Sequence, residues 1–276
     1  MSRSIAILGK GGVGKTFLAA HLGMALGYLG DKTLVVGCDQ KRDTIRALSA
    51  QRRPSLVEYL EQAGFDYARF ELVPIISQIT ENVDALELGP SQLLVGHTSG
   101  VLEEALHLFD QHGVFSTYQR ILFDVNDERF DASHAPLLRR VETIVAVTDD
   151  TPESLFVLNR LLRALLIGSA EHDLAARLLG VVHNRAVNPQ AFEHYVELSN
   201  IYPLLSIGDS GELARLRPQH RTLFALEELS PELNAALLGM LKIAELLRGD
   251  PLNLYPIMPL DDEEIWRLAA QQPPEN

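Results

Sequence analysis

The chain has 276 residues, of which 46% are hydrophobic and 22% charged, so it can bury a sizeable apolar core. Its formal net charge of −13 argues against non-specific binding to nucleic acid or to an anionic lipid surface, because such binding needs clustered Lys and Arg. The segment 40–54, QKRDTIRALSAQRRP, is the only candidate basic patch. The single cysteine, Cys38, excludes an internal disulfide and any metal site built from several thiolates of one chain.

No apolar run approaches the roughly 20 residues that span a bilayer, and the first residues do not have the shape of a signal peptide. We therefore expect a cytoplasmic protein without a membrane partner. No repeat or low-complexity linker divides the chain, which favours one domain over 1–276. Its end, 260–276, is acidic and then proline-rich, which indicates a short helix followed by a partly flexible tail.

Short apolar, β-branched runs alternate with longer stretches of helical periodicity, which predicts an α/β fold with a doubly wound, mostly parallel sheet of about seven strands. In chain order, the expected strands are 4–9, 33–38, 83–89, 120–125, 143–148, 178–184 and 202–207. The expected helices between and after them are 15–29, 54–63, 91–112, 132–140, 152–167, 189–199 and 230–248.

The first strand leads into a phosphate-binding loop. Gly9, Gly14, Lys15 and Thr16 satisfy the pattern GxxxxGK[ST] between a strand and a helix, which is the context that the motif requires. Backbone N–H groups and the helix N-terminus face the phosphates, Lys15 reaches the terminal phosphates and Thr16 binds Mg²⁺. The residues expected to bind ATP here are Gly11, Gly12, Val13, Gly14, Lys15, Thr16 and Phe17.

Lys10 adds a second lysine directly after the first glycine of the loop. In this respect the chain resembles the deviant P-loop ATPases, which include the nitrogenase iron protein, the partition and division-site ATPases and the arsenite-pump ATPase. The resemblance implies that Lys10 crosses a homodimer interface to the partner's nucleotide, so that ATP holds two subunits together. The alternative is a solvated loop charge.

The segment 35–46, VVGCDQKRDTIR, narrows the resemblance. It is similar to the switch segment of the nitrogenase iron protein and of the ATP-binding L and X subunits of the dark-operative protochlorophyllide and chlorophyllide reductases. The stretches 147–161, 180–185 and 258–268 resemble the protochlorophyllide reductase L subunit most, so the similarity covers nearly the whole chain.

The resemblance implies roles for four further residues. Asp39 would lie near the γ-phosphate and orient the attacking water, and Asp43 would lie close to Mg²⁺. Asp124 would hold Mg²⁺ through water, and Asn184 would read adenine. The residues themselves support Asp39 and Asp124, because ligands of doubly wound sheets bind at the carboxyl ends of the strands, although helix N-capping remains an alternative.

The family holds one [4Fe–4S] cluster between two subunits through two cysteines of each, and this chain has no cysteine at either position. His97 and Asp131 stand at or beside them, and two chains supply only two Cys38 thiolates, so we expect no standard cluster. Two imidazoles and two carboxylates suit Zn²⁺ or Fe²⁺, with His134 as a possible addition. The alternative is that these residues are surface polar groups left after loss of the cluster.

Two further departures concern hydrolysis and docking. Asp127 stands where the second switch has its glycine, and Glu128 where the family has an aspartate, which indicates slow hydrolysis or a retuned switch. The family's docking arginine is replaced within Thr98–Gly100.

Four functions follow from this sequence. The one we favour is a dimeric, cluster-free ATP-binding switch, and a probable ATPase, that acts on a protein partner in regulation or assembly. A reductase component passing electrons through a metal at His97 and Asp131 is the main alternative. A spatial organiser on DNA or membrane is disfavoured by the charge, and an inert nucleotide binder would differ from the switch only in its rate.

Overall fold

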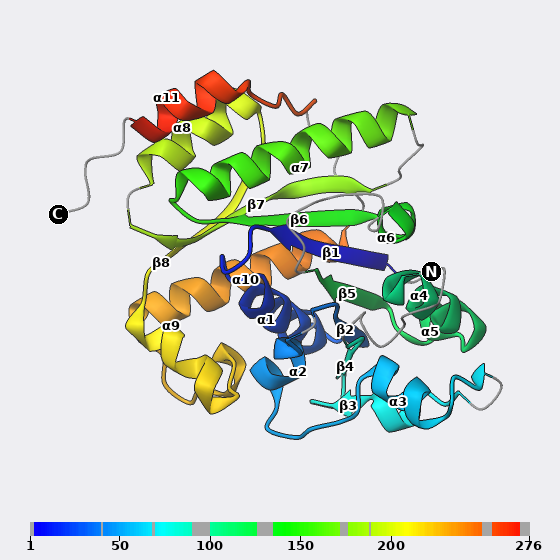
Figure 1. Ribbon diagram of the computed structural model, residues 1–276. Helices are drawn as coiled ribbons and strands as arrows, with labels where there is room; N and C mark the ends of the chain where they lie inside the picture. Colours follow the sequence, from blue (N-terminus) through cyan, green and yellow to red (C-terminus); the bar gives the residue numbers. More distant parts are fainter. Residues whose placement is uncertain are drawn as a thin grey trace.

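A computed structural model of the chain describes residues 3–39, 41–67, 70–89, 100–125, 135–171, 176–187, 189–249 and 256–270. Its centre is one twisted sheet with the strand order β3-β4-β2-β5-β1-β6-β7-β8 (Figure 1). Every neighbouring pair is parallel except β3 and β4. The strands are β1 (Arg3–Gly9), β2 (Thr33–Gly37), β3 (Ser77–Gln78), β4 (Val83–Glu87), β5 (Arg120–Asp124), β6 (Thr143–Thr148), β7 (Arg177–Ala186) and β8 (Pro203–Gly208).

The order of the strands places the functional edge of the sheet. The chain enters the sheet at its middle with β1, builds one side through β2, β4 and β5, and then crosses β1 to build the other side from β6. β1 therefore lies between β5 and β6, and the sheet is built outward from it toward opposite edges on its two sides. In doubly wound sheets this switch point is where ligands bind.

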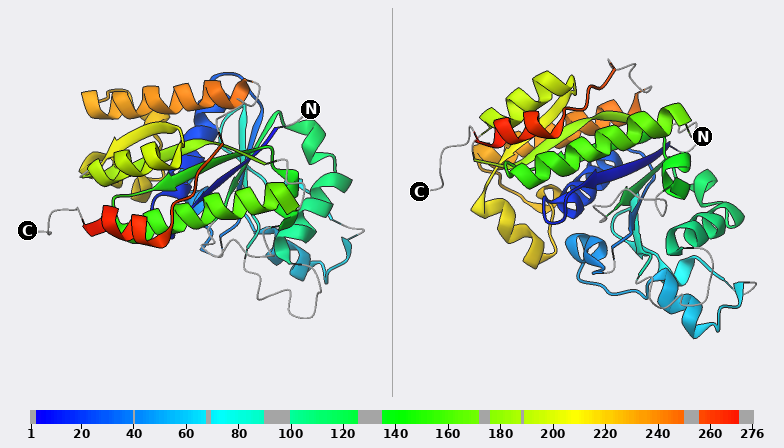
Figure 2. Two further views of the ribbon diagram at one scale, coloured as in Figure 1. Left: turned by 90° about the horizontal axis from the view of Figure 1, so that it is seen from above. Right: turned by 45° about the horizontal axis from the view of Figure 1, so that its top comes forward.

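Helices cover both faces of the sheet, as the two turned views show (Figure 2). Alternate residues of β1 explain why, since Ala6 and Leu8 pack into one core and Ile5 and Ile7 into the other. The helices are α1 (Lys15–Tyr28), α2 (Asp43–Leu48), α3 (Leu56–Gln62), α4 (Val101–Gln111), α5 (Val114–Thr117), α6 (Ala135–Arg140), α7 (Pro152–Glu171), α8 (Gln190–Ser199), α9 (Gly211–Leu216), α10 (Pro231–Arg248) and α11 (Asp262–Ala270), with 3₁₀ turns η2 (Val73–Ile75), η5 (Arg217–Gln219) and η6 (Leu223–Ala225).

The predicted α/β fold with a mostly parallel sheet is confirmed, and each of the seven expected strands is present. Four elements were not predicted, namely β3, α2, α5 and α9, and all of them are six residues or shorter. Such short pieces carry too few periodic positions to stand out in the sequence. The helix expected over 91–112 is seen from Val101 onward, after its N-cap Gly100, and the one expected over 132–140 from Ala135.

The predicted helix near the end of the chain is present as α11, and it is packed against α7 and α8 (Figure 1). Asn159 of α7, which is 1% exposed, anchors the segment before it: its amide donates to the Leu260 carbonyl at 2.9 Å and accepts from the Leu260 N–H at 2.8 Å. Ile265 and Leu268 of α11 are buried in the core. The part of the expected tail up to residue 270 is therefore a docked helix.

Within the described residues, no helix is both long and apolar enough to cross a bilayer.

Candidate nucleotide site

The loop between β1 and α1 has the close backbone approaches that its glycines permit. A Cβ on Gly9 would lie 2.2 Å from the Val147 carbonyl oxygen of β6. Gly14, the N-cap of α1, has φ 101°, and a Cβ there would lie 2.2 Å from Asn184 Nδ2. Any side chain at either position would push the loop away from the neighbouring strands, so these glycines fix the cradle.

Lys15 is held inside the loop. The residue is 3% exposed, and its Nζ donates to the carbonyl oxygens of Gly9 at 2.9 Å and Lys10 at 2.7 Å. These bonds keep the ammonium group hydrogen-bonded at the N-terminus of α1, where the helix dipole also favours an anion. A bound phosphate would find this charge already in place.

Asp124 ends β5 behind the loop and is fully buried. Its Oδ2 accepts from the Thr44 hydroxyl at 2.8 Å, whereas its Oδ1 has no hydrogen-bond partner among the described residues. Burial raises the pKa of this carboxyl, and the hydroxyls of Thr16 and Thr44 and the charge of Lys15 oppose that rise. An unsatisfied carboxylate oxygen beside a hydroxyl suits a hydrated hard cation, so the residues fit Mg²⁺.

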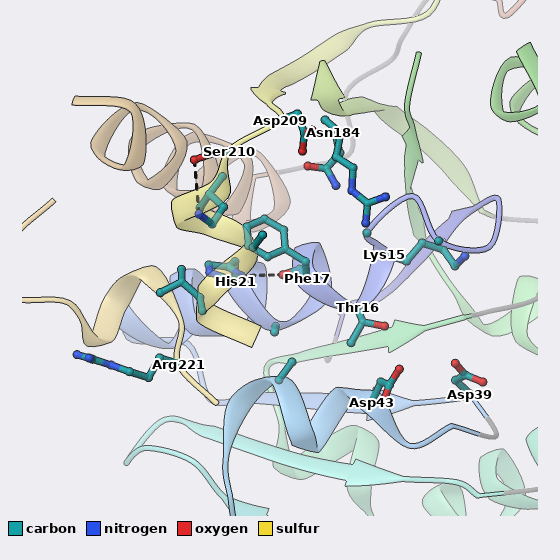
Figure 3. Close-up of a pocket in the computed structure, with 18 of the residues that line it drawn as sticks. Lys15, Thr16, Phe17, His21, Asp39, Asp43, Asn184, Asp209, Ser210 and Arg221 are labelled. Atoms are coloured by element: carbon teal, nitrogen blue, oxygen red, sulfur yellow. Dashed lines mark hydrogen bonds between the residues drawn. The ribbon is translucent and has the colours of Figure 1, made fainter. Parts of the chain in front are cut away.

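The segment after β2 supplies two further acids. Asp39 is 9% exposed, and its Oδ1 accepts from the Lys41 N–H at 3.0 Å, which fixes the turn into α2. Asp43 is the first residue of α2. Figure 3 shows both carboxylates on one wall of the pocket, facing the side where Lys15 and Thr16 lie.

Asn184 of β7 closes the opposite side of the loop. It is 8% exposed, and its Nδ2 donates to the Val13 carbonyl at 2.7 Å. The bond ties β7 to the cradle and places the amide at the pocket, where the resemblance expected a residue that reads adenine. The amide oxygen is the part of this side chain that the Val13 contact does not use.

These groups surround one pocket of about 340 Å³, a size typical of small-molecule sites. Of the predicted residues, the pocket brings together Gly12, Gly14, Lys15, Thr16, Phe17, Asp39, Asp43 and Asn184. Gly11, Val13 and Asp124 lie in the loop or behind it and do not line the pocket itself.

Lys10 does not line the pocket of its own chain. It is half-buried, and its charge contributes to lowering the pKa of Asp149, the residue that follows β6, although hydrogen bonds from Ser154 and Thr151 contribute more. The role in the partner's site that the resemblance implies remains a prediction.

Several pocket residues escaped the sequence prediction. They come from the β8–α9 loop, α9, the stretch after η5 and the second turn of α1, and they include Asp209, Ser210, Leu213, Arg221 and His21 (Figure 3). A signal existed for the first two, because the polar pair in "SIGDS" directly follows a strand at the carboxyl edge of the sheet.

His21 is a structural member of this group. Its Nε2 accepts from the Leu223 N–H at 3.1 Å and its Nδ1 donates to the Phe17 carbonyl at 2.8 Å, an arrangement that needs the neutral ring. Burial lowers the pKa of His21 to about 4, which agrees with a neutral imidazole. The histidine therefore joins α1 to the stretch around η6 and shapes that end of the pocket.

Glu87 is a further acid that the sequence prediction missed. It ends β4, is 2% exposed and accepts from the Ile45 N–H of α2 at 2.8 Å through Oε1. Burial, with the nearby charges of Asp124 and Asp39, raises the pKa of Glu87 to about 8. The signal was a glutamate at the end of an apolar strand, and its position became meaningful only once β4 was placed beside β2.

The residues expected at the former cluster positions, His97 and Asp131, lie outside the described residues, and so do Asp127, Glu128 and His134. Cys38 is described, and its Sγ contacts the Val36 carbonyl at 3.8 Å. Burial, with the charges of Asp124, Glu87 and Asp39, raises the pKa of its thiol. A thiol that resists ionisation is a poor iron ligand, so the thiols present do not fit a [4Fe–4S] cluster.

Comparison with known families agrees with this geometry. Residues 3–271 match the family described as 4Fe-4S iron sulfur cluster binding proteins, NifH/frxC family. The chain belongs to the NifH/frxC family. Its relatives include the light-independent protochlorophyllide reductase iron-sulfur ATP-binding proteins of Chlorobium chlorochromatii and Chlorobium luteolum, each 29% identical to it over 98% of this chain and 99% of their own length.

Solved structures show the same fold at lower identity. The septum site-determining protein MinD of Pyrococcus horikoshii, complexed with Mg-ADP, aligns with a TM-score of 0.69 and 20% identity over 92% of this chain and 100% of its own. A ParA family ATPase from Chlorobium tepidum aligns with a TM-score of 0.68 and 17% identity over 87% of this chain and 98% of its own. This NifH/frxC chain therefore has the fold of the MinD and ParA P-loop ATPases.

Proposed function

We propose that this protein is an ATP-driven switch that works as a homodimer and lacks a standard [4Fe–4S] cluster. Two copies close around Mg-ATP, hydrolysis reopens them, and the closed dimer engages a protein partner in regulation or assembly. One observation carries the proposal: the nucleotide pocket retains its lysine, hydroxyl and carboxylates, whereas the chain has one cysteine, the half-buried Cys38 that directly follows β2.

The residues of the pocket have different roles in ATP hydrolysis. Lys15 exchanges its two loop carbonyls for phosphate oxygens and so stabilises the negative charge on the terminal phosphates. Thr16 and Asp124 would hold Mg²⁺, which would neutralise part of the charge of the phosphates. Asp39 would orient the attacking water, and Asp43, on the same wall of the pocket, would be close to the cation.

Lys10 completes the site of the other subunit in this proposal. Its absence from the pocket of its own chain supports a role across the dimer interface. The closed dimer would then form only with the nucleotide bound, because two like-charged lysines at an interface need the phosphates between them. ATP thereby becomes the signal that a partner protein detects.

A second function is favoured by the relatives. The two Chlorobium proteins are named as the ATP-binding component of a reductase, and the alignment covers nearly the whole chain. In this alternative, electrons would pass through an unconventional metal site at His97 and Asp131. The chain has only one cysteine, which argues against a [4Fe–4S] cluster. This alternative therefore depends on His97 and Asp131.

The dimer is tested by light scattering with ATP, comparing the wild type with two variants of equal charge change. We expect Lys15→Ala to weaken ATP binding at least about tenfold, because a hydrogen-bonded charge contributes about 1.5–3 kcal/mol. Lys10→Ala should bind ATP as a monomer like the wild type but dimerise more weakly. Equal ATP-induced dimerisation of Lys10→Ala and the wild type would contradict the assignment of Lys10.

A further inference from the structure

A second pocket of about 580 Å³ lies beside α2, and its lining is strongly basic. Lys41, Arg42 and Arg46 come from the segment around the start of α2, Arg52 and Arg53 from the loop before α3, and His220 from the turn after η5. A chain with a formal net charge of −13 thus gathers five of its 24 Lys and Arg residues around one concavity. The nucleotide site already described does not account for this cluster.

Much of this positive charge is not neutralised by neighbours. Arg42 is paired with Glu58 at 2.6 Å and Arg46 with Asp43 at 3.4 Å. Within the part of the chain that the structure describes, Lys41, Arg52 and Arg53 have no carboxylate within 4.0 Å, and all three are exposed. Like charges gathered around one cavity repel one another, so binding of an anion in the pocket is electrostatically favourable.

A buried polar group also lines the pocket. Glu87 is 2% exposed, yet its Oε2 has no hydrogen-bond partner among the described residues. The raised pKa of Glu87 means that this carboxyl can hold a proton at neutral pH, and a protonated carboxyl donates a hydrogen bond to an anion. Leaving a buried polar atom without a partner is costly, so a hydrogen bond between Glu87 and a bound anion would be favourable.

The basic pocket adjoins the nucleotide pocket, and Lys41 lines both, but the rest of their linings differ. Asp43 and Ala47 of α2, four residues apart on one helix face, line the nucleotide pocket. Ile45, Arg46 and the following Ser49 line the basic pocket from the other side. Apart from Lys41, a nucleotide bound beside Asp43 therefore contacts none of the residues that line the basic pocket.

We propose that the basic pocket binds a small soluble molecule that carries two or more phosphate or carboxylate groups. The pocket is concave and within the size range of small-molecule sites, and its cations converge from three separate segments. Arginine side chains bind phosphate and carboxylate through two parallel hydrogen bonds, and several such groups around one cavity select a multiply charged ligand. The acidic remainder of the molecule disfavours an extended polyanion such as nucleic acid.

Calorimetric titration with pyrophosphate tests this site. The nucleotide pocket is first saturated with ADP in the absence of free Mg²⁺, so that pyrophosphate cannot occupy the phosphate loop. We expect the wild type to bind one pyrophosphate, and Arg52→Ala/Arg53→Ala to bind it at least about tenfold more weakly, because both guanidinium groups are exposed and hydrogen bonds to charged groups are strong.

The matched control is Arg160→Ala/Arg267→Ala, which removes the same charge from exposed positions of α7 and α11. The control should bind pyrophosphate like the wild type. The proposal is overturned if the wild type does not bind pyrophosphate, if both double variants lose binding equally, or if a hexaglutamate peptide binds where pyrophosphate does not. Failure would leave the ATP-driven dimer standing, since Arg52 and Arg53 do not line the nucleotide pocket.

Discussion

At the scale of single residues, Glu87 shows how the fold changes the chemistry of a side chain. Its carboxyl lies at the end of β4 next to β2, within the electrostatic reach of Asp124 and Asp39 and beside Thr44 and the Cys38 thiol. Burial is the largest cause of its raised pKa, and the two aspartates add to it. The Ile45 N–H acts in the opposite direction.

This raised pKa makes stability depend on pH. The carboxyl ionises near 4.5 in an unfolded chain and near pH 8 in the folded one, so unfolding releases a proton between these values. Stability from this group is fully present below pH 4.5 and is lost as the pH rises toward 8. Glu87→Gln has no proton to release, so its stability relative to the wild type should increase across this window, by at most about 1.4 kcal/mol per pH unit.

Urea unfolding of the nucleotide-free protein in EDTA, at pH 5 and at pH 8, measures the effect of Glu87→Gln. Glu245→Gln on the exposed side of α10 is the control, and its stability relative to the wild type should not change between the two pH values. If Glu87→Gln shows the same difference from the wild type at both pH values, Glu87 is ionised in the folded protein and the assignment is wrong.

The sequence located the cradle residues because a P-loop is a local motif, written in eight consecutive residues. Glu87 and Asp209 could not be recognised in the same way. Their meaning depends on which strands become neighbours, and β4 and β8 lie at positions in the sheet that no local pattern specifies. Asn184 was placed by the resemblance, and its bond to the Val13 carbonyl joins segments 171 residues apart.

At the scale of elements, the docking of α11 rests on a small polar network. Asn159 satisfies both backbone groups of Leu260, and its Oδ1 also lies 3.2 Å from the Tyr195 hydroxyl of α8. The apolar residues Ile265 and Leu268 then follow on the buried face of α11. The sequence predicted a short helix here, and its acidic residues Asp262 and Glu263 are exposed to solvent.

Asn159→Ala should weaken the attachment of α11 and the segment before it to α7. The substitution leaves the buried Leu260 N–H without its partner, while the Leu260 carbonyl keeps its bond from Arg163, so we expect a loss of about 1–3 kcal/mol in the free energy of unfolding. Arg160→Ala, at the exposed neighbouring position, should change it by less than about 0.5 kcal/mol. The checks are urea unfolding and proteolysis near residue 260. Equal stability of Asn159→Ala and the wild type would show that α11 is held in place without Asn159.

The longer elements were predictable because their apolar residues recur with the right period over many positions. The longest of the missed elements, α2 and α9, have only six residues each, and α2 is held by tertiary contacts. For α2, these contacts are the Ile45 N–H to Glu87 and the Thr44 hydroxyl to Asp124. Both partners lie on other strands, so the helix that forms one wall of the nucleotide pocket depends on the assembled sheet.

At the scale of the whole molecule, the family of the chain and its cysteine content favour different functions. The chain belongs to a family described by its iron–sulfur cluster, and its relatives are named as reductase components. Yet two copies bring two thiols in all, and each belongs to a half-buried Cys38 beside the nucleotide site. The presence of the phosphate loop without the cysteines for a cluster is the observation behind the proposed nucleotide-gated switch.

The central claim is tested most directly by the iron, sulfide and zinc content of the protein, measured with its visible spectrum after anaerobic purification from cells with active cluster assembly. The account predicts a colourless protein without stoichiometric iron or sulfide that still dimerises with ATP. A brown protein with stoichiometric iron and sulfide would contradict it, and would make His97 and Asp131 the first residues to replace.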